Sequence, residues 1–127
     1  MAKTSSEDKR LTRVSEIALS LPEVKRELHG SHATFLVRKK PFAYYLDNHH
    51  GDGIVGVTCK VLPGENQSLV EAQPDRFYPP AYLASRGWVA LRLDRGKIDW
   101  REVKDLLLGS YAMIAPKRLA ELVISDL

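Results

Sequence analysis

The sequence lacks the features that cross-link proteins through cysteine or anchor them in membranes. It holds one cysteine, Cys59, which excludes an intrachain disulfide and a multi-cysteine zinc site. No uninterrupted apolar stretch exceeds five residues, as in Tyr111–Ala115, whereas a membrane-spanning helix needs about 20. The first ten residues, Met1–Arg10, are polar and charged and lack the apolar centre of a signal peptide. We therefore expect a cytoplasmic protein that does not enter a membrane.

Composition and charge placement say more than the net charge does. The 127 residues are 44% hydrophobic and 28% charged, as in globular chains, and we expect one domain over residues 1–127. The net charge is only +3. Residues 25–60 nevertheless carry six Lys/Arg against three Asp/Glu, and residues 76–97 carry five against one. If these two stretches belong to one sheet, one side of the protein is basic.

Hydrophobic periodicity predicts an α+β fold. Apolar residues at helical spacing indicate helices over Thr4–Ser20, Pro63–Gln73, Asp99 to Pro116, and Pro116–Val123. Period-two alternation and turn signals indicate strands over Val24–Leu28, Ala33–Arg38, Pro41–Asp47, Ile54–Val61 and Gly87–Leu93. Several strands follow one another with no helix between them. This order predicts an antiparallel sheet with helices stacked on one face, and an irregular aromatic segment, Phe77–Tyr82, packed over the core.

Patterns typical of catalysis or nucleotide binding are weak. Gly51–Gly56 fits G-x-G-x-x-G, but these glycines lead into a valine-rich strand, whereas the nucleotide motif opens a helix. There is no G-x-S-x-G elbow, and no spaced pair of carboxylates stands out from ordinary surface acids. Cys59 falls on the expected buried face of its strand, where a thiol is inert. We therefore favour a non-catalytic protein without a cofactor.

Histidines near two turns leave a second type of site open. They are His29, His32, His49 and His50, and Asp47 and Asp52 flank the last two. If the two hairpin ends meet in space, these imidazoles and carboxylates would suit zinc or a similar ion. Their spacing matches no known metal motif, so a polar turn with solvated histidines is the simpler interpretation. A metal or small ligand at this loop remains an alternative.

Nucleic-acid binding has the best support from the residues. Three cations crowd one hairpin turn, a wing-like tip suited to phosphates, and Trp88 shares a strand face with Arg92, where its ring would stack on a base. Two more cations lie in the first turn of the last helix, where each opposes the helix dipole and lowers the stability of the helix by ~0.3–1 kcal/mol. An anionic partner, or a helix that continues through Pro116, would account for them. The expected contacts are Arg38, Lys39, Lys40, Lys60, Arg86, Trp88, Arg92, Lys117 and Arg118.

Several segments, in this order and spacing, make the chain resemble the MmcQ/YjbR-like family over about residues 10–123. They are Leu21–Val24, His32–Val37, Lys40–Ala43, the strand to Lys60 with Pro63–Glu65, Phe77–Leu83, Arg86–Val89, Ser110–Tyr111 and Ala115–Leu119. The resemblance implies a secretion-chaperone-like two-layer sandwich, in which a curved antiparallel sheet packs against helices. It also implies a double-wing DNA-binding protein, and it brings no catalytic residue set.

This sequence departs from the family pattern in two turns. Arg38–Pro41 stands where many relatives have a glycine-containing turn, and the Asp47–Gly53 loop is rich in histidine. DNA binding is thus the leading hypothesis. A protein-interaction module that binds a peptide or dimerises is the alternative, and it depends on whether Tyr78 and Tyr82 are exposed. The sequence leaves the oligomeric state open.

Overall fold

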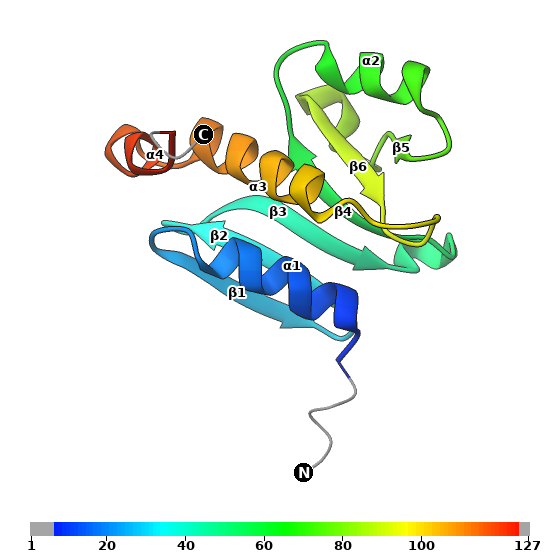
Figure 1. The fold of residues 1–127 in the computed structure, drawn as a ribbon, viewed down its shortest axis with the longest axis horizontal. Coiled ribbons are helices and arrows are strands. Elements are labelled where there is room, and N and C mark those ends of the chain that lie inside the picture. The colour runs from blue at the N-terminus through cyan, green and yellow to red at the C-terminus, as the bar shows by residue number, and fades with distance from the viewer. Residues whose placement is uncertain (1–6, 125–127) are drawn as a thin grey trace.

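A six-stranded antiparallel sheet forms the centre of the computed structural model, which describes residues 7–124 except the side chain of His50 (Figure 1). The strands run in the order β1-β2-β3-β4-β6-β5, and each neighbouring pair is antiparallel. Their bounds are β1 Val24–His29, β2 His32–Val37, β3 Lys40–Asp47, β4 Val55–Lys60, β5 Phe77–Tyr78 and β6 Trp88–Arg92.

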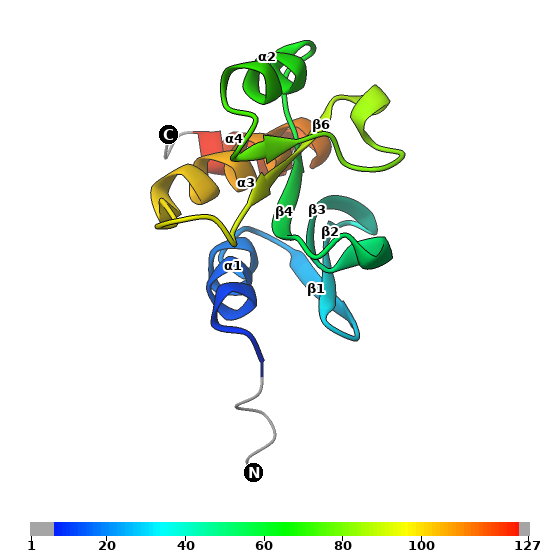
Figure 2. The ribbon, with the colours of Figure 1, turned by 90° about the vertical axis from the view of Figure 1, so that its right-hand side faces the viewer.

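Four helices complete the fold. They are α1 (Lys9–Leu19), α2 (Glu65–Ala72), α3 (Trp100–Ile114) and α4 (Lys117–Ile124), with short 3-10 turns η2 (His49–Gly51) and η3 (Ala84–Arg86). Figure 2 shows α1 and α3 on the same side of the sheet, with α2 beyond the β6 end. Helix α4 packs on α3. The predicted α+β class, with an antiparallel sheet against helices, is confirmed. No described helix is long and apolar enough to cross a bilayer.

The core lies between the helices and the face of the sheet that we call the inner face. Alternate residues of β4, such as Val57 and Cys59, point into it and are fully buried. From α3, the ring of Tyr111 meets that of Phe42 edge-on at 5.4 Å between centroids. The buried hydroxyl of Ser110 donates to Phe42 O at 2.6 Å and accepts from Lys60 N at 3.0 Å. Helix α3 is thereby fixed across β3 and β4.

Two elements differ from the sequence-based expectation. Helix α1 begins at Lys9, because the Asp8 carboxylate accepts from Arg10 N at 2.8 Å and caps the helix there. Thr4, the expected start, lies outside the described residues. In the aromatic segment, Phe77 and Tyr78 form strand β5 on the edge of β6, where Phe77 is buried. Tyr82 is 86% exposed.

Candidate nucleic-acid interface

The β2–β3 turn holds its cations in an unusual backbone conformation. Only Arg38 and Lys39 lie between the paired residues Val37 and Lys40, so the turn has two residues. Their φ angles are +51° and +70°. Such hairpin turns favour Asn-Gly, because side chains with a Cβ are strained at positive φ. Both Arg38 and Lys39 are exposed, in the turn that follows the last paired residue of β2.

Strand register brings further cations to the same end of the sheet. Ala43 pairs with Cys59, so Lys60 at the end of β4 lies beside the start of β3. Lys60 in turn pairs with Trp88, and η3, which ends at Arg86, is separated from Trp88 by Gly87 alone. Helix α3 runs to this end, and α4 starts from it. We call this surface the basic end, and its members are Arg38, Lys39, Lys40, Lys60, Arg86, Lys117 and Arg118.

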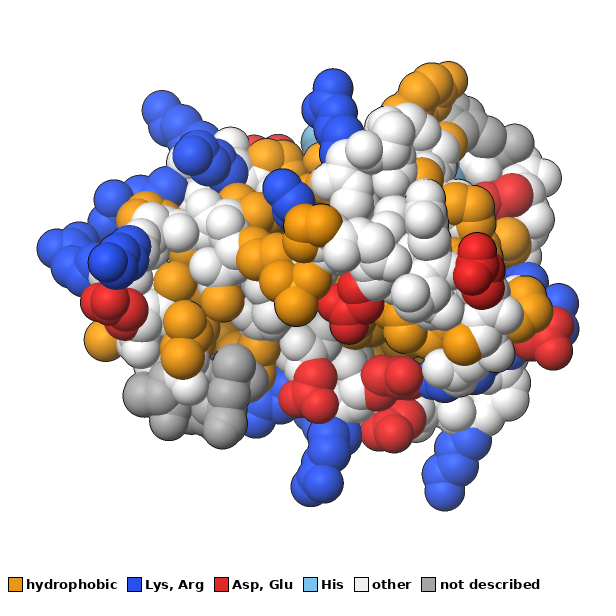
Figure 3. All heavy atoms as spheres, turned by 90° about the horizontal axis from the view of Figure 1, so that it is seen from above, with side chains coloured by type: hydrophobic (Ala, Val, Ile, Leu, Met, Phe, Trp, Pro, Cys, Tyr) orange, Lys and Arg blue, Asp and Glu red, His pale blue; other side chains and the backbone are white. Residues whose placement is uncertain are grey.

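Helix α4 adds its cations at its positive end. Helix α3 stops at Ile114 and Ala115 is extended, so α4 begins afresh at Lys117 and is not a continuation of α3. Its first turn contains no acidic residue. Lys117 and Arg118 are therefore placed where they oppose the helix dipole. Figure 3 shows Lys and Arg side chains gathered at the end of the molecule that carries α4.

One acidic residue partly neutralises the positive charge of the basic end. Glu23, between α1 and β1, accepts from Arg38 Nε at 2.6 Å and from Arg38 Nη2 at 3.1 Å. These bonds, and the charges of Arg38 and Arg118, lower the pKa of Glu23. Because both partners are about half exposed, the ion pair is weak, and Arg38 stays available to another anion.

Two predicted residues do not join the basic end. Arg92 lies at the opposite end of β6 and is bound by Asp94, with Nε to Oδ1 at 2.9 Å. Trp88 is only 7% exposed, and its ring packs beside Tyr44 at 5.6 Å between centroids. It lies on the outer face of the sheet, as its alternation predicts, but α2 and η3 cover it. Trp88 therefore presents no ring face for stacking on a base.

Sequence reasoning missed Lys25. It lies on the outer face of β1 and lines a surface hollow of about 590 Å³ together with Arg38, Lys39 and the apolar Leu36. The hollow adjoins the basic end and also contains the acids Glu23 and Glu27. The alternation of β1 was the available signal, because it sets Lys25 opposite Leu36 and away from the core. The low apolar content of this strand obscured that signal.

The histidines form no metal centre among residues 7–124. His32 and His49 do meet, edge-on at 5.4 Å between ring centroids, so the two turns come together. However, His32 Nε2 is hydrogen-bonded to the carbonyl oxygen of Asp47 at 2.8 Å, and His29 lies beside Glu27. No three His, Cys, Asp or Glu side chains in the described part of the chain gather around one point. His50 lies outside the described side chains.

Cys59 is sealed in the core, and burial raises the pKa of its thiol. A neutral, inaccessible thiol is a poor nucleophile.

Comparison with known proteins agrees with this fold. A crystal structure of the Deinococcus radiodurans protein DR2400, which carries a DUF419 domain, superposes with a TM-score of 0.66. The two chains are 22% identical, and the match covers 82% of this chain and 77% of the other. This likeness concerns the fold alone. No curated protein gives a significant match. The YjbR family pattern matches residues 19–113, most of the chain, so the protein belongs to the YjbR family.

Proposed function

We propose that this protein binds DNA by contacting backbone phosphates with its basic end. The observation that carries the proposal is the convergence of cations from four separate segments, which are the β2–β3 turn, the end of β4, η3 and the start of α4. Cations spaced over one surface suit a polyanion, because each neutralised phosphate releases counterions. Binding of this kind is strongly salt-dependent and has little sequence preference.

The cost of these positions supports the same proposal. Two cations of the β2–β3 turn occupy positive φ, and two more oppose the dipole of α4. Unfavourable conformations tend to persist where function requires the side chain. An anionic ligand would offset both the mutual repulsion of the cations and the unfavourable field at the α4 N-terminus.

The direct test is a binding titration against a random duplex and a random single strand over a salt series. We expect affinity near micromolar at low salt, with a log–log slope that counts the phosphate contacts. The double variant Lys39→Glu/Lys40→Glu should weaken duplex binding by at least roughly tenfold at 0.1 M salt. Arg95→Glu/Lys97→Glu is the matched control, because it makes the same charge change in the exposed turn at the opposite end of β6.

Equal loss in both double variants would mean that net charge alone drives binding, and the basic end would lose its role. Absence of duplex and single-strand binding near 50 mM salt would overturn the proposal, because phosphate contacts are strongest at low salt.

One observation favours a protein partner as the second candidate. Tyr82 is 86% exposed, has a φ of +66°, and follows Pro79–Pro80 in a loop at the β5 edge. An exposed aromatic side chain on a surface loop is typical of protein contacts. Sedimentation velocity would test dimerisation through this loop. We expect a native dimer that dissociates in Tyr82→Ser, and a native monomer would exclude that form of the candidate.

A further inference from the structure

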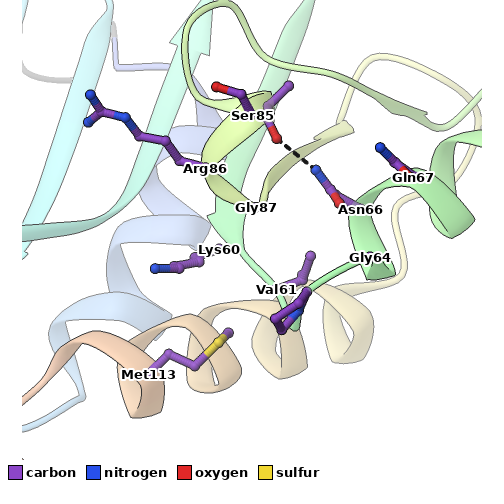
Figure 4. A pocket seen from close by; sticks show the side chains of 11 residues that line it. Lys60, Val61, Gly64, Asn66, Gln67, Ser85, Arg86, Gly87 and Met113 are labelled. Atoms are coloured by element: carbon purple, nitrogen blue, oxygen red, sulfur yellow. Dashed lines mark hydrogen bonds between the residues drawn. The ribbon is translucent and has the colours of Figure 1, made fainter.

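A cleft of about 720 Å³ opens beside the basic end, between the end of β4, the start of α2, η3 and the last turn of α3 (Figure 4). Its volume lies within the roughly 300–1,000 Å³ of small-molecule sites. It is therefore the size of one small ligand and far too small for a duplex. The lining residues are Lys60, Val61, Pro63, Gly64, Asn66, Gln67, Ala84, Ser85, Arg86, Gly87 and Met113.

The charge of the lining selects an anion. None of the described residues that line the cleft is acidic, and both of its charged side chains, Lys60 and Arg86, are cations. Figure 4 shows these two side chains extending toward the same side of the cleft. The adjoining groove between α2 and α3 is more acidic, since its lining includes Glu65, Asp99, Glu102 and Asp105 besides Arg101 and the shared Lys60. An anion entering this region is thus favoured in the cleft over the adjoining groove.

The walls of the cleft are fixed by hydrogen bonds. The Asn66 side-chain amide of α2 donates to Ala84 O at 2.9 Å and to Trp88 O at 3.3 Å, which ties η3 to α2. The backbone of Val61 donates to Gly87 O at 3.0 Å and closes the floor. A cavity held in this way is formed before a ligand arrives, so little binding energy is lost in ordering it.

The remaining lining suits a flat, polar-edged group. Met113 is 38% exposed, and a thioether makes favourable contacts with aromatic rings. The side chains of Gln67 and Ser85 make no hydrogen bond within residues 7–124 and are exposed around the cleft. A nucleobase combines an aromatic face with donors and acceptors along its edge.

We propose that this cleft binds one nucleoside 5′-monophosphate unit, with the phosphate between Lys60 and Arg86 and the base toward Met113. The unit is either a free nucleotide or the 5′-phosphorylated end of a strand, which share this chemistry. This inference rests on the proposed function in one respect, which is that Lys60 and Arg86 belong to the basic end as well as to the cleft.

Calorimetric titration with thymidine 5′-monophosphate tests the proposal, with thymidine and inorganic phosphate as comparison ligands. We expect the monophosphate to bind at least roughly tenfold more tightly than either, since both the anion and the base are recognised. Lys60→Gln/Arg86→Gln should lose at least roughly tenfold of that affinity, because charged hydrogen bonds are about twice as strong as neutral ones. Arg95→Gln/Lys97→Gln, in the exposed turn at the opposite end of β6, is the matched control and should keep it.

A second variant separates charge from shape. Ser85→Trp leaves both cations in place and fills the cleft from an exposed position, so it should fold normally and abolish thymidylate binding. Oligonucleotides with and without a 5′-phosphate distinguish the two sources of the ligand. If the protein prefers the phosphorylated oligonucleotide, the ligand is the 5′ end of a strand. If it binds thymidylate but does not distinguish the two oligonucleotides, the ligand is the free nucleotide.

Three results would overturn the inference. They are no thymidylate binding at millimolar concentration, equal binding of inorganic phosphate, and unchanged affinity in Lys60→Gln/Arg86→Gln. If any of these occurred while the native protein bound duplex, the proposed function would stand without the nucleotide site. Thymidylate binding without duplex binding would support the nucleotide site and remove the proposed function.

Discussion

Replacing Lys39 by glycine should make the protein more stable and a weaker DNA binder. Its φ of +70° costs an L-residue roughly 1–2 kcal/mol, a strain that glycine does not have. Glycine also raises the entropy of the unfolded chain, which takes back about 0.5–1 kcal/mol. The net expectation is a gain of about 0.5–1 kcal/mol in the free energy of unfolding, or about 2–4 °C in Tm. Urea unfolding and a thermal melt measure it.

Lys40→Gln is the control, because it removes an equal charge from the adjacent residue, whose φ is not positive. Both variants should weaken duplex binding by a similar several-fold factor at 0.1 M salt, since each loses one phosphate contact. Only Lys39→Gly should gain stability. A Lys39→Gly protein that unfolds more easily than the native one would refute the strain argument. Native affinity in both variants would remove the turn from the interface.

Three other perturbations test separate parts of the structure. Glu23→Gln should raise duplex affinity several-fold at 0.1 M salt, because it removes a negative charge that lies beside Arg38 and would repel phosphates, and an anisotropy titration that shows no gain would contradict this. Ser110→Ala should lower the free energy of unfolding by about 1–3 kcal/mol in urea, because two buried backbone groups of β3 and β4 lose their partner, and a change below experimental error would contradict it. Arg92 lowers the pKa of Asp94, so the ionised carboxyl stabilises the fold above the unfolded pKa of about 4, and this contribution is lost as the pH falls through the lower folded pKa. Asp94→Asn should therefore flatten the dependence of unfolding free energy on pH below about 4, and a slope equal to that of the native protein would count against the ion pair.

The fold could be predicted from local signals because those signals are strong here. Alternation in β4 gives its inner and outer faces, and Asp99 caps α3 by accepting from Arg101 N and Glu102 N, as its position predicts. The exception at α1 has a local cause as well. The Asp8 carboxylate accepts from Arg10 N, and α1 begins at the next residue after this cap, Lys9.

The candidate site was harder to predict, because it depends on contacts between distant segments. Alternation places Trp88 on the outer face, but it does not reveal that α2 and η3 cover that face locally. Arg92 is a different case, because its partner Asp94 lies only two residues away and the pair is visible in the sequence itself. Conversely, Lys25 is distant in sequence from Arg38 and Lys39, and it shares a hollow with them only because β1 pairs with β2.

Two features of the basic end are unfavourable for stability. Positive φ costs each of the two residues of the β2–β3 turn roughly 1–2 kcal/mol of stability. Each cation at the start of α4 costs ~0.3–1 kcal/mol. Neither feature compensates for the other, since both add positive charge to one surface. Glu23 relieves only Arg38 and, more weakly, Arg118. The stabilising response would come from an anion that contacts several of these residues together, so ligand binding should raise Tm most in the native protein and less in each charge-removing variant.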